Sequence, residues 1–422
     1  MLFIAYHYPP GRAGGAERSA QFARLLPASG YCPIVLTTSA FGGAGDPRVR
    51  RAWEPLKWYR QAFNRAARTG ADAQARTDPG PFRGVVRVLR RQLAVPDLQI
   101  TWVPAALRCA LQVVRREAPR VVYSTYPPAS AHLLGLLLKQ WTGLPWVADF
   151  RDAWSGDPLD PDLPSWRQAL ERRLERLVVE GADAVIATTR ISASYLQQAY
   201  PCAASRVQVI TNGFDPGDFA GAGACPPAGD PLRLVHTGSF SRSHPQRTPQ
   251  PLFAALESLL AEDPAWAGRL RLTLVGQLTP GERRAAAGLE RAGMVEIKGA
   301  LPRPQALDVQ RQAHLLLLVD HPRPWPASNV PGKFYEYLAM RRPVLALCGP
   351  GMVEEMVRQL QAGLCAPPDD PQAIRRVLAE VYARFRQGRL QAGADETALG
   401  QFHRAELTRQ LARCFDRLLE QV

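Results

Sequence analysis

The sequence SNVPGKFYEYLAMRRPVLAL, which starts at Ser328, holds the side chains whose types and spacing point most directly to a charged ligand. Pro331 predicts a helix start, because its missing N–H would be unpaired in the first turn in any case. Ser328 or Asn329 is the expected cap. Lys333 and Glu336 are three apart, so they share one face of that helix. A lysine for phosphate and a carboxylate for hydroxyl groups, at a helix start that favours anions, predict a nucleotide-diphosphate ligand.

The elements that must position these residues are short apolar runs alternating with helical patterns, which favours two α/β halves with parallel sheets. The runs of the first half are residues 2–6, 33–37, 121–125, 146–150, 184–188 and 207–210. Those of the second half are residues 232–236, 272–275, 295–298, 315–319 and 344–347. A stretch rich in Gly, Pro and Asp, residues 211–230, lies between the halves and reads as a boundary. We therefore predict domains at 1–212 and 213–398, with a helical segment at 399–422 packing back on the first domain.

Polar residues follow the strands of the first half, where open α/β sheets bind ligands. Gly14 and Gly15 precede a helix predicted near residue 16, so they either line a ligand or form a plain structural turn. Asp149, Arg151 and Asp152 follow the fourth run in the sequence ADFRDAW. Two carboxylates beside an arginine at a strand end predict a functional cluster, with a structural salt bridge as the alternative.

His132 lies on the apolar helical stretch that follows the third run. A single histidine on such a face is most often a packed core residue. The alternative is that its imidazole contacts a substrate at the sheet edge.

Polar residues also follow the strands of the second half. Gly238 and Ser239 form a tight turn after residues 232–236, and Arg242 and Arg247 come before the next predicted helix. A guanidinium is well shaped to bind a diphosphate, and a solvated loop position is the alternative, more so for Arg242 than for Arg247. Arg303 is expected on a loop at the same edge.

Composition restricts the class of protein. The chain has 422 residues, too many for one ordinary core, and 46% hydrophobic residues. No apolar run approaches the roughly 20 residues that span a bilayer. The seven cysteines form no CxxC pair, so a metal or redox site is not expected and the cytoplasm is the simplest compartment. Met1 leads directly into an apolar run, which predicts no signal peptide.

The formal net charge of +14 needs an explanation. Residues 41–100 read as a basic insertion, in which arginines alternate with aromatic and aliphatic residues. That pattern suits an anionic membrane surface, and the charge would also attract nucleic acid. A solvated basic insertion is the competing interpretation.

The ordered set of these motifs resembles glycosyltransferase family 4, whose members are retaining, nucleotide-sugar-dependent enzymes. The matching pieces span nearly the whole chain: YHYPPGRAGGAER, ADFRDAW, TNGFD, HTGSF, RTPQPLFAAL, LVGQL, IKGALPR and PGKFYEYLAMRRPVLAL. The motifs FRDAW and PGKFYEYLA resemble those of the bacterial branch of the family that builds surface polysaccharides, the WbuB/WcaI-like transferases. The resemblance implies the GT-B fold, in which two Rossmann-like domains face each other across a cleft, and no metal or other cofactor.

The resemblance also assigns roles to residues. It implies that the second domain binds the nucleotide sugar, with Glu336 on the ribose hydroxyls and Arg247 with Lys333 on the diphosphate. Ser328 stands where the family often has a second glutamate. The implied donor-binding residues are Gly238, Ser239, Arg247, Ser328, Asn329, Val330, Pro331, Gly332, Lys333 and Glu336.

The first domain supplies the other side of the implied site. Gly14 and Gly15 match the glycine loop that lines the cleft, and Asp149 and Arg151 occupy the acceptor side. Asp152 or the departing phosphate oxygen takes the acceptor proton, and we favour the phosphate, with Asp152 or His132 positioning the acceptor. The implied catalytic residues are Asp152, His132, Arg247 and Lys333. The expected partners are a nucleotide-diphosphate sugar, a glycan or lipid-linked acceptor and an anionic membrane surface at the cytoplasmic face, without nucleic acid.

Three other classes of protein compete with this interpretation. A nucleotide-sugar epimerase on the same architecture would need no acceptor. A nicotinamide-dependent oxidoreductase is disfavoured, since no GxGxxG follows a strand with an acidic residue about 20 positions on. A non-enzymatic membrane- or nucleic-acid-binding protein would depend on the basic insertion alone.

Overall fold

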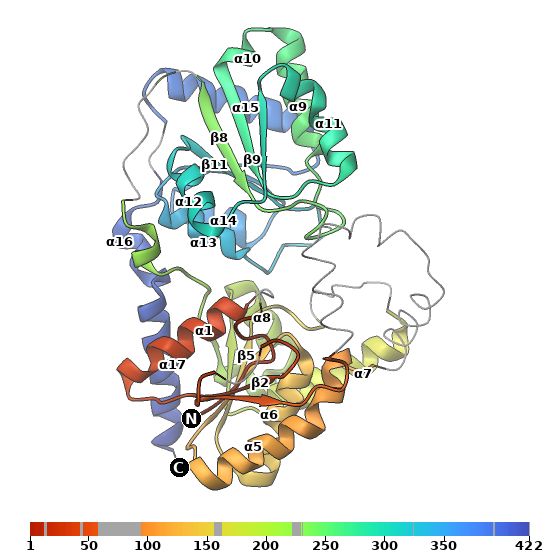
Figure 1. The fold of residues 1–422 in the computed structure, drawn as a ribbon, viewed down its shortest axis with the longest axis vertical. Coiled ribbons are helices and arrows are strands. Elements are labelled where there is room, and N and C mark those ends of the chain that lie inside the picture. The colour runs from red at the N-terminus through yellow and green to blue at the C-terminus, as the bar shows by residue number, and fades with distance from the viewer. Residues whose placement is uncertain are drawn as a thin grey trace. The chain divides into compact units, whose positions relative to one another are not determined.

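A computed structural model describes residues 1–11, 15–42, 45–57, 94–155, 163–221, 229, 231–323, 325–390 and 393–421. The chain divides into two compact units, Met1–Asn212 with Arg404–Val422, and Gly213–His403. Each unit is a parallel β-sheet with helices packed on it (Figure 1). In the described ranges no helix is long and apolar enough to cross a membrane.

The first unit contains a seven-stranded sheet in the order β3-β2-β1-β4-β5-β6-β7. Its strands are β1 Leu2–Ile4, β2 Ile34–Thr38, β3 Val49–Ala52, β4 Val122–Tyr126, β5 Trp146–Phe150, β6 Ala184–Ala187 and β7 Val207–Val209. Its helices are α1 Ala16–Leu25, α5 Val103–Glu117, α6 Ala129–Thr142, α7 Ser165–Gly181, α8 Arg190–Ala199 and α17 Arg404–Leu419, with 3-10 turns at Leu26–Ser29, Leu98–Trp102 and Pro201–Arg206.

Alternate residues of the first-unit strands face two separate apolar cores, as the period of two in a strand requires. Leu2 and Ile4 of β1 pack in the core under α5 and α6, whereas Phe3 packs in the core under α1 and α17. Leu411 and Phe415 bring α17 into that second core. The last helix of the chain therefore packs on the first unit.

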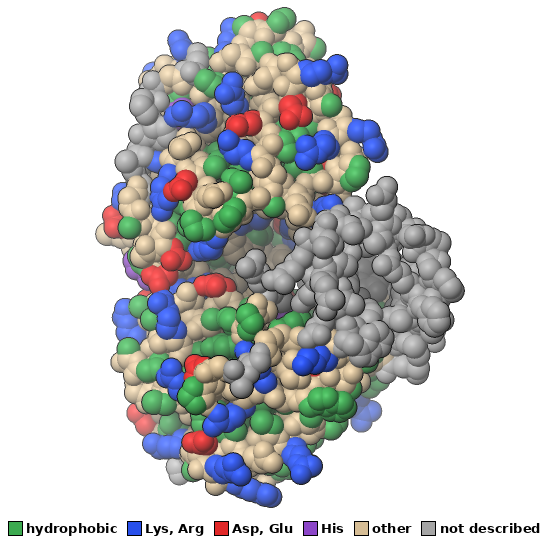
Figure 2. Space-filling model, in the orientation of Figure 1, with side chains coloured by type: hydrophobic (Ala, Val, Ile, Leu, Met, Phe, Trp, Pro, Cys, Tyr) green, Lys and Arg blue, Asp and Glu red, His purple; other side chains and the backbone are tan. Residues whose placement is uncertain are grey.

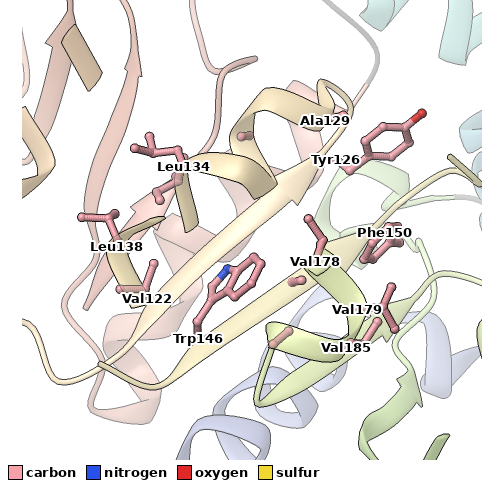
Figure 3. Packing of buried hydrophobic residues seen from close by; sticks show 14 of the residues in the cluster. Val122, Tyr126, Ala129, Leu134, Leu138, Trp146, Phe150, Val178, Val179 and Val185 are labelled. Carbon is pink, nitrogen blue, oxygen red and sulfur yellow. The ribbon is translucent and has the colours of Figure 1, made fainter. Parts of the chain in front are cut away.

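Trp146 of β5 occupies the middle of the larger core, next to Val122, Leu138 and Val178 (Figure 3). Its indole N–H donates to Ser124 Oγ at 2.8 Å. A Cβ on Gly135 of α6 would lie 2.4 Å from the indole nitrogen, so only glycine lets this helix pass over the ring.

The second unit contains a six-stranded sheet in the order β10-β9-β8-β11-β12-β13. Its strands are β8 Leu232–Thr237, β9 Leu270–Val275, β10 Val295–Gly299, β11 Leu315–Val319, β12 Val344–Leu347 and β13 Gly363–Ala366. Its helices are α9 Gln250–Glu262, α10 Trp266–Arg269, α11 Pro280–Arg291, α12 Arg303–Arg311, α13 Gly332–Ala339, α14 Met352–Gln359, α15 Pro371–Arg386 and α16 Glu396–Leu399, with 3-10 turns at Pro216–Phe219 and Gly400–Phe402. The central run β11, LLLLV, is fully buried, as expected for a strand covered on both faces.

The sequence did not predict the edge strands β3 and β13. β3 reads VRRA and pairs with β2, so residues 49–52 belong to the sheet and the prediction of an insertion over 41–100 was too broad. Charged residues are common on edge strands, which hides their strand character in the sequence. Residues 58–93, the greater part of the predicted insertion, lie outside the described residues.

β13 contains Gly363, where a Cβ would lie 1.9 Å from the carbonyl oxygen of Val344 on β12. The close approach of the two strands therefore requires glycine at a position where glycine normally signals a turn.

Lys and Arg side chains are spread over the visible surface of both units rather than gathered into one patch (Figure 2). On this face the cationic side chains of the described residues are therefore dispersed. A wide basic patch of the kind that binds nucleic acid is not visible there.

Candidate functional site

The helix start predicted around Pro331 is present, but its details differ from the prediction. Pro331 itself is the N-cap of α13, and no side chain caps the helix, so the prediction that Ser328 or Asn329 does so was wrong. Ser328 Oγ and Asn329 Oδ1 are buried and have no hydrogen-bond partner among the described residues. The side chain of Val330 is buried next to them. The N–H groups of the first turn, around Gly332, are thus left without a side-chain cap, which suits an anion.

Lys333 extends from this helix start to the turn after β8. A Cβ on Gly238 would lie 2.8 Å from Lys333 Nζ, so the ammonium group lies directly against this glycine. Gly238 also has a φ of 111°, which side chains avoid. Burial lowers the pKa of Lys333 to about 8, and Arg247 contributes in the same direction. The structure therefore brings Gly238, Arg247 and Lys333 together, and Ser239 continues the same turn half-buried.

A buried carboxylate organises the arginines beside Lys333. Asp320, which directly follows β11, is 3% exposed and lies 3.1 Å from Arg247 Nη2 and 3.1 Å from Arg323 Nη1. His321 Nδ1 lies 3.0 Å from the same carboxylate, and the arrangement holds the pKa of Asp320 well below its usual range despite its burial. Arg247 Nε has no partner among the described residues. The ion pair with Asp320 holds the guanidinium of Arg247 in place, and its Nε–H is left without an acceptor among the described residues.

The formal charges of this cluster do not cancel. Arg247, Arg323 and Lys333 bring three positive charges to the one buried carboxylate of Asp320, and Glu336 also acts on Lys333. Positive charge therefore remains in excess, which favours an anionic ligand such as a diphosphate.

Two histidines pack against the cluster. The ring of His244 stacks on His321 with centroids 3.6 Å apart, and burial lowers the pKa of His244 to about 4. His236, on β8, stacks on Phe240 at 4.4 Å, and burial holds its pKa well below the usual value. Neutral imidazoles thus line the site without adding to its charge.

Glu336 lies on α13 one turn beyond Lys333, where the sequence placed it. Its carboxylate pairs with Arg303 of α12, and Arg303 also pairs with Asp218 at 3.1 Å. Both residues are partly exposed, so this carboxylate can still be reached by a ligand. Of the two arginines that the sequence offered, Arg247 forms an ion pair with Asp320 and Arg242 does not.

Sequence reasoning missed Asp320, His321, Arg323, His236 and His244. One signal was available, because Asp320 is the first residue after the predicted strand at 315–319. His321 and Arg323 are one and three residues beyond Asp320, so the same strand end could have drawn attention to them. His236 and His244 belong to the cluster only through contacts between residues far apart in sequence.

In the first unit, the residues expected on the acceptor side differ in burial and in hydrogen bonding. Asp149 is fully buried and accepts two hydrogen bonds from Arg18 of α1, at 3.0 and 3.2 Å, and one from the hydroxyl of Tyr123. Arg18 also donates to the carbonyl oxygens of Ile210 and Thr211. Both oxygens of Asp149 thus serve a buried ion pair, the structural alternative that the sequence offered, and its assignment to the acceptor side stays a prediction.

Arg151 and Gly15 do meet. A Cβ on Gly15 would lie 0.8 Å from Arg151 Nη1, and the guanidinium donates to the carbonyl oxygens of Tyr126 and Pro127 at 2.8 Å. Gly14 lies outside the described residues. Asp152 is partly exposed, so it is the carboxylate of this motif that a ligand can reach.

His132 is a packed core residue, the first of the two alternatives that the sequence offered, and its role in positioning an acceptor stays a prediction. Its side chain is fully buried, its ring lies 4.6 Å from that of Phe150, and its Nδ1 lies 2.8 Å from Ser124 Oγ. Burial lowers its pKa to about 3, so it is neutral.

Across the described ranges, no group of three or more His, Cys, Asp and Glu side chains is arranged to hold a metal ion.

Comparison with known families identifies the class of protein. Residues 13–218 match the model of Glycosyltransferase Family 4, and residues 231–384 match that of Glycosyl transferases group 1. The chain is therefore a glycosyltransferase of the GT-B type, as the sequence motifs predicted. The family 4 match falls on residues 13–218, which carry ADFRDAW, TNGFD and the end of YHYPPGRAGGAER, three of the motifs that predicted it.

Solved structures confirm the fold. A sucrose-phosphate synthase from Thermosynechococcus elongatus has a TM-score of 0.66 and 16% identity, with 100% of this chain and 99% of that chain covered. Anabaena HepE, in complex with UDP and glucose, has a TM-score of 0.59 and 16% identity, with 99% of each chain covered. A putative UDP-N-acetylglucosamine 2-epimerase from Listeria monocytogenes has a TM-score of 0.58 and 12% identity, with 100% and 96% covered. No curated protein sequence matches the chain.

Proposed function

We propose that this glycosyltransferase takes its sugar from a nucleoside-diphosphate sugar held by the second unit and transfers it, with retention of configuration, to a glycan or lipid-linked acceptor. The observation that carries the proposal is the position of Lys333 against Gly238 at the uncapped start of α13. The complex of HepE with UDP supports the donor class. The resemblance of FRDAW and PGKFYEYLA to WbuB/WcaI-like transferases supports a role in bacterial surface polysaccharide synthesis.

The donor diphosphate lies, in this proposal, at the N-terminus of α13. Lys333 and Arg247 contact its oxygens, Gly238 and Ser239 approach it with backbone groups, and Glu336 accepts hydrogen bonds from the ribose. Asp320 acts on the diphosphate indirectly, because it holds Arg247 at 3.1 Å.

Ser328 and Asn329 complete the proposed donor site on the sugar side. Ser328 Oγ and Asn329 Oδ1 have no partner among the described residues, and the hydroxyl groups of a sugar can supply one.

The chemistry needs charge stabilisation more than covalent participation. The bond between the anomeric carbon and the diphosphate oxygen breaks, and negative charge develops on the leaving diphosphate. Lys333, Arg247 and the first turn of α13 stabilise that charge. The acceptor oxygen forms the new glycosidic bond on the face that the diphosphate leaves, and its proton passes to a phosphate oxygen. Asp152 of the first unit is the proposed acceptor-positioning group.

Binding measurements on the full chain test the donor site. Wild-type protein should bind UDP by calorimetry more tightly than UMP, because the second phosphate meets Lys333 and Arg247. Glu336→Ala should weaken UDP and uridine alike, by about tenfold, through loss of the ribose contact. Lys298→Met is the matched control, since Lys298 is paired with Glu296 on β10 and should not contact the ligand. Equal binding of UDP by wild type and Glu336→Ala would contradict the assignment of Glu336.

Product analysis separates transfer from epimerisation. The nucleotide is first chosen by thermal shift with UDP-, GDP-, ADP- and dTDP-sugars, since a ligand of the folded state raises the melting temperature. With the selected donor, transfer predicts free nucleotide and a new glycoside only when acceptor is added. A changed sugar formed from donor alone would favour the epimerase instead.

A further inference from the structure

Lys333 and Glu336 are neighbours on one face of α13, yet their side chains extend to different elements of the second unit. Residues three apart on a helix have Cβ atoms about 5–6 Å from each other, so an ammonium group and a carboxylate at these positions normally interact. Lys333 instead extends to Gly238 in the turn after β8, and Glu336 pairs with Arg303 at the start of α12. In the described part of the chain the two side chains form no ion pair with each other. Arg303 thus draws the carboxylate away from the lysine.

Arg303 occupies a position that does not favour its own helix. It is the first residue of α12, where the positive end of the helix dipole repels a cation. Its side chain is 51% exposed, and ion pairs at exposed positions contribute little to the free energy of unfolding. Burial alone would lower the pKa of Arg303, and the carboxylates of Glu336 and Asp218 raise it above its usual value. The stability of α12 therefore gives no reason for an arginine here, whereas the contacts of its guanidinium do.

A second carboxylate holds Arg303 in place. Arg303 Nη1 donates to Glu336 Oε1, and Arg303 Nη2 donates to Asp218 Oδ2 at 3.1 Å. Asp218 lies in the 3-10 turn Pro216–Phe219, which the buried side chain of Phe219 anchors. Glu336 Oε2 has no hydrogen bond to a described residue, so it can accept one from a ribose hydroxyl. Asp218 thus keeps the guanidinium beside Glu336 while one oxygen of that carboxylate remains available to a ligand.

The other groups that face Lys333 show what a released Glu336 would change. Arg247 lies on the loop before α9, Asp320 follows β11 and His236 lies on β8. Besides burial, Arg247 opposes the ammonium form of Lys333, and Asp320 favours it. His236 is neutral, because burial holds its pKa well below the usual value. A further carboxylate next to Lys333 would reduce the positive charge that attracts a diphosphate.

We propose that Arg303 is a positioning residue of the donor site. Held by Asp218, it keeps the carboxylate of Glu336 for the ribose and leaves the ammonium group of Lys333 for the diphosphate. The inference rests on the proposed donor site and deepens it, because it assigns the separation of the two contacts to a residue that acts through Glu336. Without Arg303, Glu336 turns towards Lys333, and both contacts weaken together.

Calorimetry on the full chain, with uridine and UDP as probes, tests the inference. Arg303→Met keeps an unbranched side chain and removes the guanidinium. Its affinity for uridine should fall about fivefold, through partial loss of the ribose contact, and its affinity for UDP should fall further. Arg303→Lys should restore most of both affinities, since an ammonium group can still pair with Glu336. The melting temperature should change little in either variant, because the ion pairs of Arg303 are exposed.

The pH dependence distinguishes positioning from a purely structural role. In the wild type, the ratio of UDP affinity to uridine affinity should fall as the pH rises through the pKa of Lys333, about 8. In Arg303→Met, the nearby carboxylate of Glu336 stabilises the ammonium form, so this fall should shift to higher pH. Arg311→Met is the matched control on α12, since Arg311 pairs with Asp308 and not with Glu336. Its affinities and its pH midpoint should equal those of the wild type.

A double-mutant cycle shows whether Arg303 acts through Glu336. In a Glu336→Gln background, Arg303→Met should cause no further loss of uridine affinity. An equal loss in both backgrounds would overturn the inference, and so would wild-type affinities or an unchanged pH midpoint in Arg303→Met, or the same losses in Arg311→Met. If Glu336→Ala itself binds uridine and UDP as the wild type does, the donor site is wrong and the inference falls with it. Weak binding by Glu336→Ala together with normal binding by Arg303→Met would reject the inference alone.

Discussion

Both units carry a buried carboxylate at or near the end of a central strand, yet the two carboxylates do opposite things. In the first unit Asp149 is the last residue but one of β5 and is matched by the buried Arg18, with both carboxylate oxygens occupied. In the second unit Asp320 follows β11 and is shared by two arginines, with Lys333 close by. The first arrangement is neutral and closed, whereas the second leaves positive charge over. We therefore expect surplus charge, rather than position at a strand end, to distinguish a binding group from a structural one, and the following variants test this.

The largest expected effect is that of Asp320→Asn, which should damage both stability and binding. Loss of the carboxylate leaves two buried guanidinium groups without their anion, at a cost of about 3–5 kcal/mol in the free energy of unfolding. Arg247 also loses its fixed orientation, so UDP affinity should fall while uridine affinity stays constant. Denaturant unfolding and calorimetry measure the two quantities. Weaker uridine binding would show general distortion of the site instead.

Asp149→Asn should cost a similar amount of stability and nothing in binding. The carboxamide cannot balance the charge of Arg18, so we expect a loss of about 3–5 kcal/mol in the unfolding free energy of the first unit. UDP affinity, measured by calorimetry below the unfolding transition, should equal that of the wild type. A selective loss of UDP affinity in this variant would break the contrast between the two units.

Lys333→Met should slow turnover with little harm to the fold. Removal of one preorganised cation from a developing oxyanion typically costs about 10²–10³ in kcat, or about 3–4 kcal/mol. Stability should rise slightly, because burial of the ammonium group is already unfavourable, as its lowered pKa of about 8 indicates. Steady-state kinetics with the donor chosen above measures kcat. Wild-type turnover would remove Lys333 from the mechanism.

The smallest expected effect is a dependence on pH. Only the ammonium form of Lys333 attracts the diphosphate, so UDP affinity should be full below pH 8 and fall as the pH rises through the pKa of about 8. Stability should move the other way. The unfolded chain binds a proton that the folded chain has lost, so the cost of the buried charge is relieved between pH 8 and the ordinary lysine pKa of about 10.4.

Subtracting the pH profile of Lys333→Met from that of the wild type isolates both trends, because the contributions of all other titrating groups are common to the two proteins. Identical profiles for the two proteins would show that Lys333 does not titrate in this range.

Much of the fold was predictable because its central strands are long apolar runs. β5 and β11 begin and end where the sequence placed them, since strands buried on both faces are mostly apolar. The edge strands β3 and β13 were not predictable, because their charged or glycine residues resemble loops. The boundary stretch after residue 211 and the final helix were visible as changes in composition and period.

The candidate site divides in the same way. Lys333, Glu336 and Gly238 were found because local rules of helix starts and strand ends apply to them. Asp320 and its near neighbour Arg323 were missed although the same rule covers the end of β11. His244 was missed because it joins the cluster only through its ring contact with His321, which is far away in sequence. Conversely, Asp149 and His132 lie near strand ends as the rule requires, yet both side chains are fully buried.

The sequence by itself determined the two parallel sheets, the order of the motifs and the helix start at Pro331, because these depend on residues close together in the chain. The tertiary structure alone decided which charges cancel. Arg18 and Asp149 are far apart in sequence, as are Arg247 and Asp320, and the same kinds of side chain gave a closed ion pair in one unit and a cationic surplus in the other. Electrostatic interactions act through space, so the charge available to a ligand is set only when the sheets are assembled.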